Sequence, residues 1–273
     1  MNRTSPIGVI DSGIGGFSVA KKVQELLPWE DILYFGDGAN TPYGNHDADT
    51  ILEMTQYMLD FMRQNEVKLL LVACNTISCL IDSYRDEMNC PVLSVVEAGA
   101  QAAANLTGGK IGVVSTCFTH RTGCYPKAIH AIAPEKQVFS KGCANLAHLV
   151  ETYLGREDGQ EIIRAEVQTD LEEFAVQNPV DCCVLGCTHF PLVREEIDNL
   201  FPGLMLLDPA EEMVNTAHKY LQERGEEREH SHVGQMKIVT TVDVEEYATK
   251  ARQVGLINIV SVDVFPVIQR KTI

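Results

Sequence analysis

Two short segments of the chain, Leu69–Thr76 and Cys183–His189, share an uncommon arrangement. In each, an apolar run of β-type residues ends in a cysteine, which is followed by hydroxyl or amide residues and a segment of helical character. A thiol at the start of a helix lies beside unpaired backbone N–H groups and the positive end of the helix dipole, which stabilise the thiolate. We therefore expect the pKa of both Cys74 and Cys187 to be lowered.

Two activated thiols in one site would form a pair of acid and base groups. If they face each other, one can remove a proton from a carbon atom while the other returns a proton to the opposite face. That is the chemistry of a racemase without a cofactor. The chain shows no lysine motif typical of pyridoxal phosphate enzymes, so we expect no cofactor.

A zinc site built from Cys182, Cys183, Cys187 and His189 is a competing interpretation of the second segment. Cys182 and Cys183 are neighbours in an apolar strand, so their side chains point to opposite faces and are poorly placed to bind one ion. We therefore expect no metal. The chain also lacks a G-x-S-x-G motif, which argues against a serine hydrolase.

An aspartate follows the first apolar run, in the segment Asp11–Gly16. The segment is not a dinucleotide-binding fingerprint, because Ser18 stands where the third glycine belongs and because Asp11 would repel a pyrophosphate. An acid at the tip of a strand, beside the hydroxyl of Ser12, could orient an amino group or assist a neighbouring thiol. The alternative is that Asp11 caps the first helix.

Two further groups of residues could bind a carboxylate. The loop of Pro42, Tyr43 and Gly44 offers backbone N–H groups around a glycine, although an ordinary turn is the simpler interpretation. Thr116 and Thr119 place hydroxyls at the start of another helix, which suits an anion but equally suits helix capping.

The composition is that of an ordinary globular protein. Of 273 residues, 45% are hydrophobic and 22% are charged, which allows two lobes of modest size. The formal net charge of −16 argues against nucleic acid or an anionic membrane as the main partner. There is no apolar run that could span a bilayer and no leader before Ile7, so we expect a soluble cytoplasmic protein.

The nine cysteines are expected to be reduced, because the chain is long enough to form a core without disulfides. We expect inert packing for Cys79, Cys90, Cys124 and Cys182, as for most free cysteines.

Apolar runs of β type alternate with segments of helical period along most of the chain. This pattern predicts an α/β fold with mainly parallel sheets, whose ligands gather at the carboxyl ends of the strands. A weak repeat relates Ile7–Ser12 to Ile111–Thr116 and favours two similar lobes. The predicted strands are Ile7–Ile10, Ile32–Phe35, Leu69–Val72, Val92–Val96, Ile111–Val114, Cys182–Leu185, Met205–Leu207, Lys237–Thr240 and Ile257–Val262.

Two local signals concern the last part of the chain. The charged stretch Gly225–His232 has no period and predicts a surface loop. Asp243 with Glu246 three residues later predicts a capping box for a helix over Val244–Val254.

Taken together, these motifs resemble those of the glutamate racemase family within the aspartate/glutamate racemase superfamily, over nearly the whole chain. The two cysteine motifs in combination are the most specific part. The segments that carry the resemblance are Ile10–Gly16, Tyr34–Asp37, Pro42–Gly44, Ala73–Thr76, Ile111–Val113 with Thr116, Leu185–Leu192 and Thr240–Thr241.

The resemblance implies two pseudo-symmetric α/β lobes, each with a mainly parallel sheet flanked by helices, and an active site between the lobes. The first lobe would comprise residues 1–96 with 210–273, and the second lobe residues 97–209. The resemblance also implies a racemase that interconverts L- and D-glutamate without a cofactor and supplies D-glutamate for peptidoglycan. Its partner would be a small amino-acid substrate, and it could form a homodimer.

By the same resemblance, Cys74 and Cys187 are the catalytic bases, and Asp11, His189 and Glu151 act beside them. The residues implied in binding the substrate are Asp11, Ser12, Pro42, Tyr43, Gly44, Cys74, Asn75, Thr76, Thr116, Thr119, Cys187, Thr188 and His189.

The chain departs from the family pattern at several positions. Gly38 and Asn40 stand where the family usually has threonine and arginine, while Ala144 and Pro209 replace a proline and a serine. These departures concern side-chain specificity and assembly more than the reaction. Two alternatives therefore stay open: a racemase of the same superfamily that acts on aspartate or another amino acid, and a non-catalytic binding protein on this scaffold.

Overall fold

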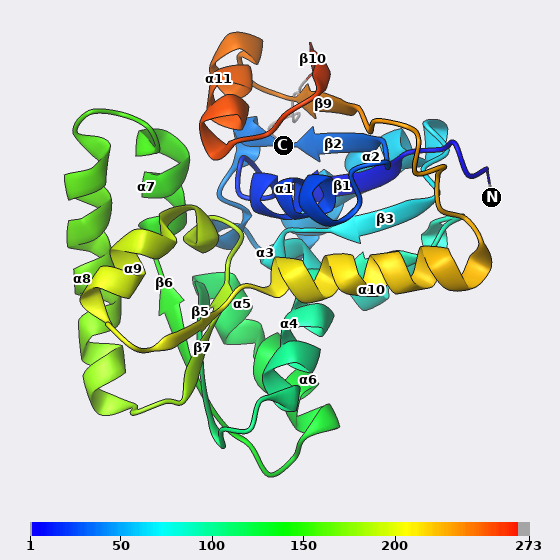
Figure 1. Ribbon diagram of the computed structural model, residues 1–273. Helices are drawn as coiled ribbons and strands as arrows, with labels where there is room; N and C mark the ends of the chain where they lie inside the picture. The colour runs from blue at the N-terminus through cyan, green and yellow to red at the C-terminus, as the bar shows by residue number, and fades with distance from the viewer. Residues whose placement is uncertain (1, 267–273) are drawn as a thin grey trace.

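The computed structural model describes residues 2–266, which form two parallel β-sheets (Figure 1). Within this part of the chain, the larger sheet has six strands in the order β10-β9-β2-β1-β3-β4, and every pairing is parallel. Its strands are β1 (Ile7–Asp11), β2 (Ile32–Gly36), β3 (Leu69–Val72), β4 (Val92–Ser94), β9 (Met236–Thr240) and β10 (Ile259–Val264).

The smaller sheet has four strands in the described residues, in the order β6-β5-β7-β8 and again all parallel. This order repeats that of β2-β1-β3-β4, so the two sheets share one topology. The lobe boundaries near residues 96 and 210 stay a prediction. The strands of the smaller sheet are β5 (Lys110–Thr116), β6 (Gln137–Cys143), β7 (Cys182–Gly186) and β8 (Met205–Leu207).

Helices flank both sheets, and α10 begins near the smaller sheet and runs along the larger one (Figure 1). The α-helices are α1 (Phe17–Leu26), α2 (Ala48–Gln64), α3 (Asn75–Ser78), α4 (Val95–Asn105), α5 (Cys117–Thr122), α6 (Cys124–Ile132), α7 (Leu146–Tyr153), α8 (Gly159–Gln177), α9 (Arg194–Leu200), α10 (Pro209–Arg224) and α11 (Val244–Val254). The short 3₁₀ helices are η1 (Gly38–Asn40), η2 (Tyr43–Asn45), η3 (Ile81–Ser83), η4 (Arg85–Glu87) and η5 (Phe190–Val193).

Successive residues of a strand point to opposite faces of the sheet, and each face has its own core. Ile7 and Val9 of β1 belong to a core with α1 and α10, whereas Ile10 belongs to a core with α2. The first core continues through α4 and α6 to Val113 and Val184 of the smaller sheet. One hydrophobic core therefore runs through both sheets.

The predicted strands are present, with changes at their ends. The expected strand Val92–Val96 ends at Ser94, because the hydroxyl of Ser94 accepts a hydrogen bond from the backbone N–H of Glu97 and begins α4. The expected strand Ile257–Val262 lies two residues later, as β10. Strand β6 is absent from the prediction, because its sequence is partly polar and it forms a half-exposed edge of the smaller sheet.

Helix α11 has the predicted bounds, and the carboxylate of Asp243 accepts a hydrogen bond from the backbone N–H of Glu246 at 2.9 Å. The N-cap bond of the predicted capping box is therefore confirmed, while the carboxylate of Glu246 forms an ion pair of 2.9 Å with Lys250.

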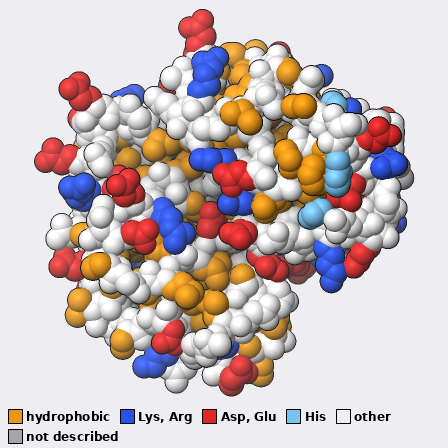
Figure 2. Space-filling model, in the orientation of Figure 1, with side chains coloured by type: hydrophobic (Ala, Val, Ile, Leu, Met, Phe, Trp, Pro, Cys, Tyr) orange, Lys and Arg blue, Asp and Glu red, His pale blue; other side chains and the backbone are white. Residues whose placement is uncertain are grey.

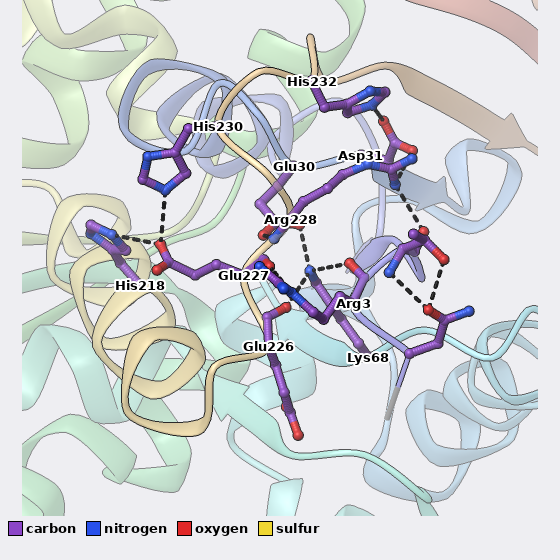
Figure 3. A network of polar contacts seen from close by, with 12 residues as sticks. Arg3, Glu30, Asp31, Lys68, His218, Glu226, Glu227, Arg228, His230 and His232 are labelled. Carbon is purple, nitrogen blue, oxygen red and sulfur yellow. Dashed lines mark hydrogen bonds and ion pairs between the residues drawn. The ribbon is translucent and has the colours of Figure 1, made fainter.

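The charged segment Gly225–His232 is a loop, as expected, but part of it is held by a buried network (Figure 3). Lys68 and Glu30 form an ion pair of 2.6 Å whose two side chains are fully buried. The ammonium group of Lys68 also donates to the backbone carbonyl of Glu226 at 2.9 Å. The network ties the loop to the strand ends of the larger sheet that lie farthest from the cysteine motifs.

No helix among residues 2–266 is long and apolar enough to cross a membrane. On the face shown in Figure 2, acidic side chains are interspersed with lysines and arginines rather than separated from them. A continuous basic surface, which nucleic-acid-binding proteins commonly use, is not seen on this face.

Candidate active site

The carboxyl ends of β1, β3, β5 and β7 meet at one small cavity between the two sheets, as expected for parallel sheets. The cavity has a volume of about 10 Å³, which is room for about one water molecule. Its lining residues are Ser12, Pro42, Tyr43, Gly44, Cys74, Asn75, Thr76, Thr116, Ala147, Cys187, Thr188 and His189.

All of these residues except Ala147 were expected at the site from the sequence. The three other expected residues lie directly behind the lining. Asp11 accepts a hydrogen bond from the hydroxyl of Thr188 at 3.0 Å, and Glu151 Oε2 lies 2.6 Å from His189 Nε2. Thr119 lies behind Thr116. The structure thus brings every expected site residue to one place, while the role of each stays a prediction.

The sulfur of Cys187 faces a histidine that is paired with an acid. Cys187 Sγ lies 3.7 Å from His189 Nδ1, and Glu151 also accepts a hydrogen bond from the backbone N–H of Ile14 at 3.0 Å. Burial by itself would lower the pKa of His189, but the hydrogen bonds and charges of Cys187 and Glu151 outweigh it and raise that pKa well above its ordinary value. A cationic imidazolium beside the sulfur is a charge partner for a thiolate.

The sulfur of Cys74 has a different environment. Burial raises the pKa of Cys74 to about 12, and the negative charge of Asp11 acts in the same direction. The expectation of a lowered pKa at Cys74 is therefore wrong. Helix α3 has only four residues, so its backbone N–H groups and the hydroxyl of Ser12, 3.8 Å from Sγ, do not offset burial.

Asp11 is fully buried at the end of β1. Its carboxylate accepts hydrogen bonds from the backbone N–H of Gly13 at 2.9 Å and from the hydroxyl of Thr188. Burial raises its pKa to about 6, against the opposing effect of the His189 charge and of these two hydrogen bonds. Asp11 does not cap α1, whose N-cap position is Gly16 with no side-chain bond.

The threonines contribute to both capping and the cavity. The hydroxyl of Thr116 accepts a hydrogen bond from the backbone N–H of Thr119 at 3.3 Å and caps α5. The same hydroxyl lies 3.1 Å from that of Thr76, which follows β3 of the larger sheet. A Cβ atom at Gly44 would lie 2.6 Å from Thr116 Cβ, so only glycine allows the loop to approach this closely.

The buried carboxylate of Asp37 fixes the loop that carries Tyr43 and Gly44. It accepts hydrogen bonds from Tyr43 at 2.6 Å, from Thr241 at 2.7 Å and from Asn40 at 2.9 Å. The 3₁₀ helix η2 is therefore more than an ordinary turn, and Asn40, one of the departures from the family pattern, takes part in holding it.

Sequence reasoning missed several tyrosines behind the site. Tyr34 and Tyr247 each donate a hydrogen bond of 2.6 Å to the backbone carbonyl of Gly13, and Tyr125 donates to the side-chain carbonyl of Asn75 at 2.7 Å. In the sequence these tyrosines look like core residues of a strand and two helices. Only the position of Tyr34 in a family motif could have signalled a role.

Cys182 and Cys183 belong to different hydrophobic cores, in agreement with the expected opposite faces of the strand. Among residues 2–266, no group of three or more histidine, cysteine, aspartate or glutamate side chains could hold a metal ion. The expectation that the protein needs no metal stays a prediction.

The family model described as Asp/Glu/Hydantoin racemase matches residues 7–217 of the chain. The glutamate racemase of Syntrophus aciditrophicus (strain SB) is 38% identical over 229 residues, which cover 81% of this chain and 83% of that protein. Among solved structures, glutamate racemase isoform RacE1 from Bacillus anthracis is similar with a TM-score of 0.88 and 31% identity, over 97% of this chain and 98% of that one.

The glutamate racemase from Francisella tularensis, solved in complex with D-glutamate, has a TM-score of 0.86 and 27% identity. The match covers 96% of this chain and 98% of that one.

Proposed function

The chain belongs to the Asp/Glu/Hydantoin racemase family, and from this premise we propose that it interconverts L- and D-glutamate by moving a proton at Cα between two cysteines. One observation carries the proposal. Cys74 and Cys187 follow equivalent strands, β3 and β7, of two sheets with the same topology, and both line one small cavity. A substrate carbon between them would have a sulfur on each face.

The two sulfurs differ in the charge of their nearest neighbours. Cys187 faces the cationic His189 and serves as the thiolate base, whereas Cys74 is held as a thiol and serves as the acid. When substrate of the opposite hand is bound, the roles exchange. Asp11, whose pKa lies near 6, adjusts the charge beside Cys74, and Glu151 holds His189 in place.

Proton removal from Cα needs stabilisation of the charge that develops on the α-carboxylate, since the α-proton of an amino acid is very weakly acidic. Oriented N–H and O–H donors in a water-poor cavity provide it. Asn75 Oδ1 is occupied by Tyr125, while Asn75 Nδ2 has no hydrogen-bond partner within residues 2–266. We assign Asn75 Nδ2, with the hydroxyls of Thr76 and Thr116, to the substrate carboxylates.

Glutamate is the proposed substrate because the relatives named above are glutamate racemases, one of them solved with D-glutamate. The loop around Tyr43 and Gly44 would receive the distal carboxylate. One methylene shifts discrimination by ~1–3 kcal/mol. We therefore expect kcat/KM for glutamate to exceed that for aspartate by about tenfold or more. The proposed role is supply of D-glutamate for peptidoglycan in the cytoplasm, and the proposed assembly is a homodimer.

A chiral assay of the purified protein against L- and D-amino acids tests the substrate. A preference for aspartate or for an uncharged amino acid would contradict glutamate while leaving the two-cysteine reaction intact. No turnover of any amino acid would favour a binding protein on this scaffold.

Turnover in deuterium oxide tests the use of two bases. The product should carry solvent deuterium at Cα, while the remaining substrate acquires little at early times. Equal and rapid labelling of both enantiomers would indicate a single base that exchanges freely with solvent.

A further inference from the structure

Cys79 and Cys124 were expected to be inert packing residues, but the structure places their sulfur atoms 2.7 Å apart. Both side chains are half-buried, and the two cysteines are 45 positions apart in the sequence. Cys79 follows α3, beside the larger sheet, and Cys124 begins α6, beside the smaller sheet. We propose that these two thiols are a redox modification site, at which a peroxide forms a reversible disulfide that restrains α3 against α6 and slows turnover.

The geometry needs little change for the bond to form. A disulfide bond is about 2.05 Å long, so the two sulfurs would have to approach by only about 0.7 Å. Each cysteine lies at the end of a short helix rather than in the middle of a strand. Their partial exposure also gives a small oxidant access, in contrast to the buried cysteines of the cores.

The local chemistry selects Cys124 as the attacking group. The hydrogen bond from Cys79, together with N–H groups at the start of α6, lowers the pKa of the Cys124 thiol although burial opposes it. The Cys124 thiolate attacks hydrogen peroxide, the O–O bond breaks, and a sulfenic acid and a hydroxide ion form. The hydroxide ion combines with the proton that Cys124 lost on ionisation, which gives the first molecule of water.

In the second step, the sulfur of Cys79 attacks the sulfenic sulfur of Cys124. The S–O bond breaks, the S–S bond forms, and the proton of the Cys79 thiol leaves with the hydroxyl group as water. In total, two thiols lose two electrons, peroxide gains them, and two molecules of water result. A dithiol reductant reverses the reaction by thiol–disulfide exchange.

The disulfide would join the two walls of the cavity. Helix α3 carries Asn75 and Thr76, whereas the chain before Cys124 carries Thr116 and Thr119. The cavity is almost closed, because Cys74 and Cys187 are each only 4% exposed. Substrate can therefore enter only when the walls move apart, and a covalent link between them opposes that motion.

The experiment treats the reduced full-length protein with hydrogen peroxide and measures peptides by mass spectrometry without reduction. We expect one cross-linked species that contains Cys79 and Cys124 and has lost two hydrogen atoms. Turnover should fall at least about fivefold and return after dithiothreitol. The absence of this cross-link, or full activity in cross-linked protein, would overturn the proposal.

Cys79→Ser and Cys124→Ser are the matched controls, with Cys79→Ala as a second variant if serine prevents folding. Each should form no cross-link and should keep its turnover at the peroxide dose that inhibits the wild type. Equal inhibition of these variants would assign the loss to oxidation of Cys74 or Cys187 and overturn the proposal.

The variant Cys74→Ser separates this inference from the proposed function. It should form the Cys79–Cys124 cross-link although it lacks one proposed base, because the modification does not depend on the reaction with glutamate. Failure of the glutamate assay alone would therefore leave the cross-link measurement interpretable.

Discussion

Cys74 and Cys187 are chemically the same side chain, but the charges of their neighbours differ. Burial and the charge of Asp11 keep a proton on Cys74, while His189 faces the sulfur of Cys187 with a positive charge. In the proposed reaction, Cys74 would start as the acid and Cys187 as the base, which is the combination that the first turnover of one enantiomer needs.

Replacing either Cys74 or Cys187 by serine should lower kcat by about 10²–10⁴-fold or more, because a serine alkoxide is far less accessible near neutral pH than a thiolate. Circular dichroism of the amino acid or a coupled enzymatic assay measures the rate. Cys90→Ser, which changes a buried cysteine outside the cavity, is the matched control and should keep the wild-type rate. A serine variant with near-normal turnover would remove that cysteine as a base.

Asp11→Asn should stabilise the fold while it impairs the reaction. The pKa of Asp11 rises from 3.8 to about 6 on folding, so the native state binds more protons between these values and the free energy of unfolding falls as pH rises through them. Above pH 6, the buried negative charge of Asp11 lowers the free energy of unfolding by its full amount, about 3 kcal/mol at most. Removing the charge should recover up to this amount at pH 8 and about half of it at pH 5.

Urea unfolding at the two pH values measures the effect of Asp11→Asn. Asp243→Asn is the control, because asparagine caps a helix as well as aspartate and this exposed side chain should change the free energy of unfolding by less than about 0.5 kcal/mol. A destabilised Asp11→Asn variant at pH 8 would show that the hydrogen bond from Thr188 outweighs the burial of charge.

At the scale of elements, the loop after α10 depends on the buried ion pair of Lys68 and Glu30. Lys68→Met should lower the free energy of unfolding by about 3–5 kcal/mol, because it leaves the carboxylate of Glu30 buried without its cation. Lys22→Met, which breaks the exposed pair with Glu25, should cost about 1 kcal/mol or less. Denaturant unfolding compares the two, and similar losses would contradict the role of burial.

The positions of the strands and the cavity residues could be predicted because the signals are local. The apolar run Leu69–Val72 has the bounds of β3, and polar residues after parallel strands must gather at the same edge of a sheet. The cysteine motifs therefore indicated the site from the residues alone. Glu151, which lies on a helix and not after a strand, was found only through the family resemblance.

Features that depend on tertiary contacts could not be predicted. The buried Asp37 binds Asn40 and Tyr43 of its own loop and also Thr241, which lies 204 positions later, and no pattern in the sequence relates Thr241 to this loop. The raised pKa of Cys74 could not be predicted either. The sequence shows where a helix starts, but not how short the helix is or how deeply the thiol is buried. Strand β6 was not predicted from the sequence, because an edge strand needs fewer apolar residues than a central one.

For the whole molecule, activity should not depend on a metal or a cofactor. Dialysis against a chelator should leave turnover unchanged, because the proposed reaction uses only thiols and hydrogen-bond donors of the chain. The dialysed protein should also lack the absorbance of bound pyridoxal phosphate. Loss of turnover on chelation, restored by one added metal, would contradict this prediction.

The core that runs from Ile7 through α4 and α6 to Val184 has a consequence for cooperativity. Two sheets that share one of their hydrophobic cores should melt together, although each sheet has the topology of an independent unit. Scanning calorimetry should then give one transition with equal calorimetric and van't Hoff enthalpies, and saturating glutamate should raise its midpoint without splitting it. Partial melting of the smaller sheet would therefore also disturb the larger one, and with it the cavity that holds both cysteines.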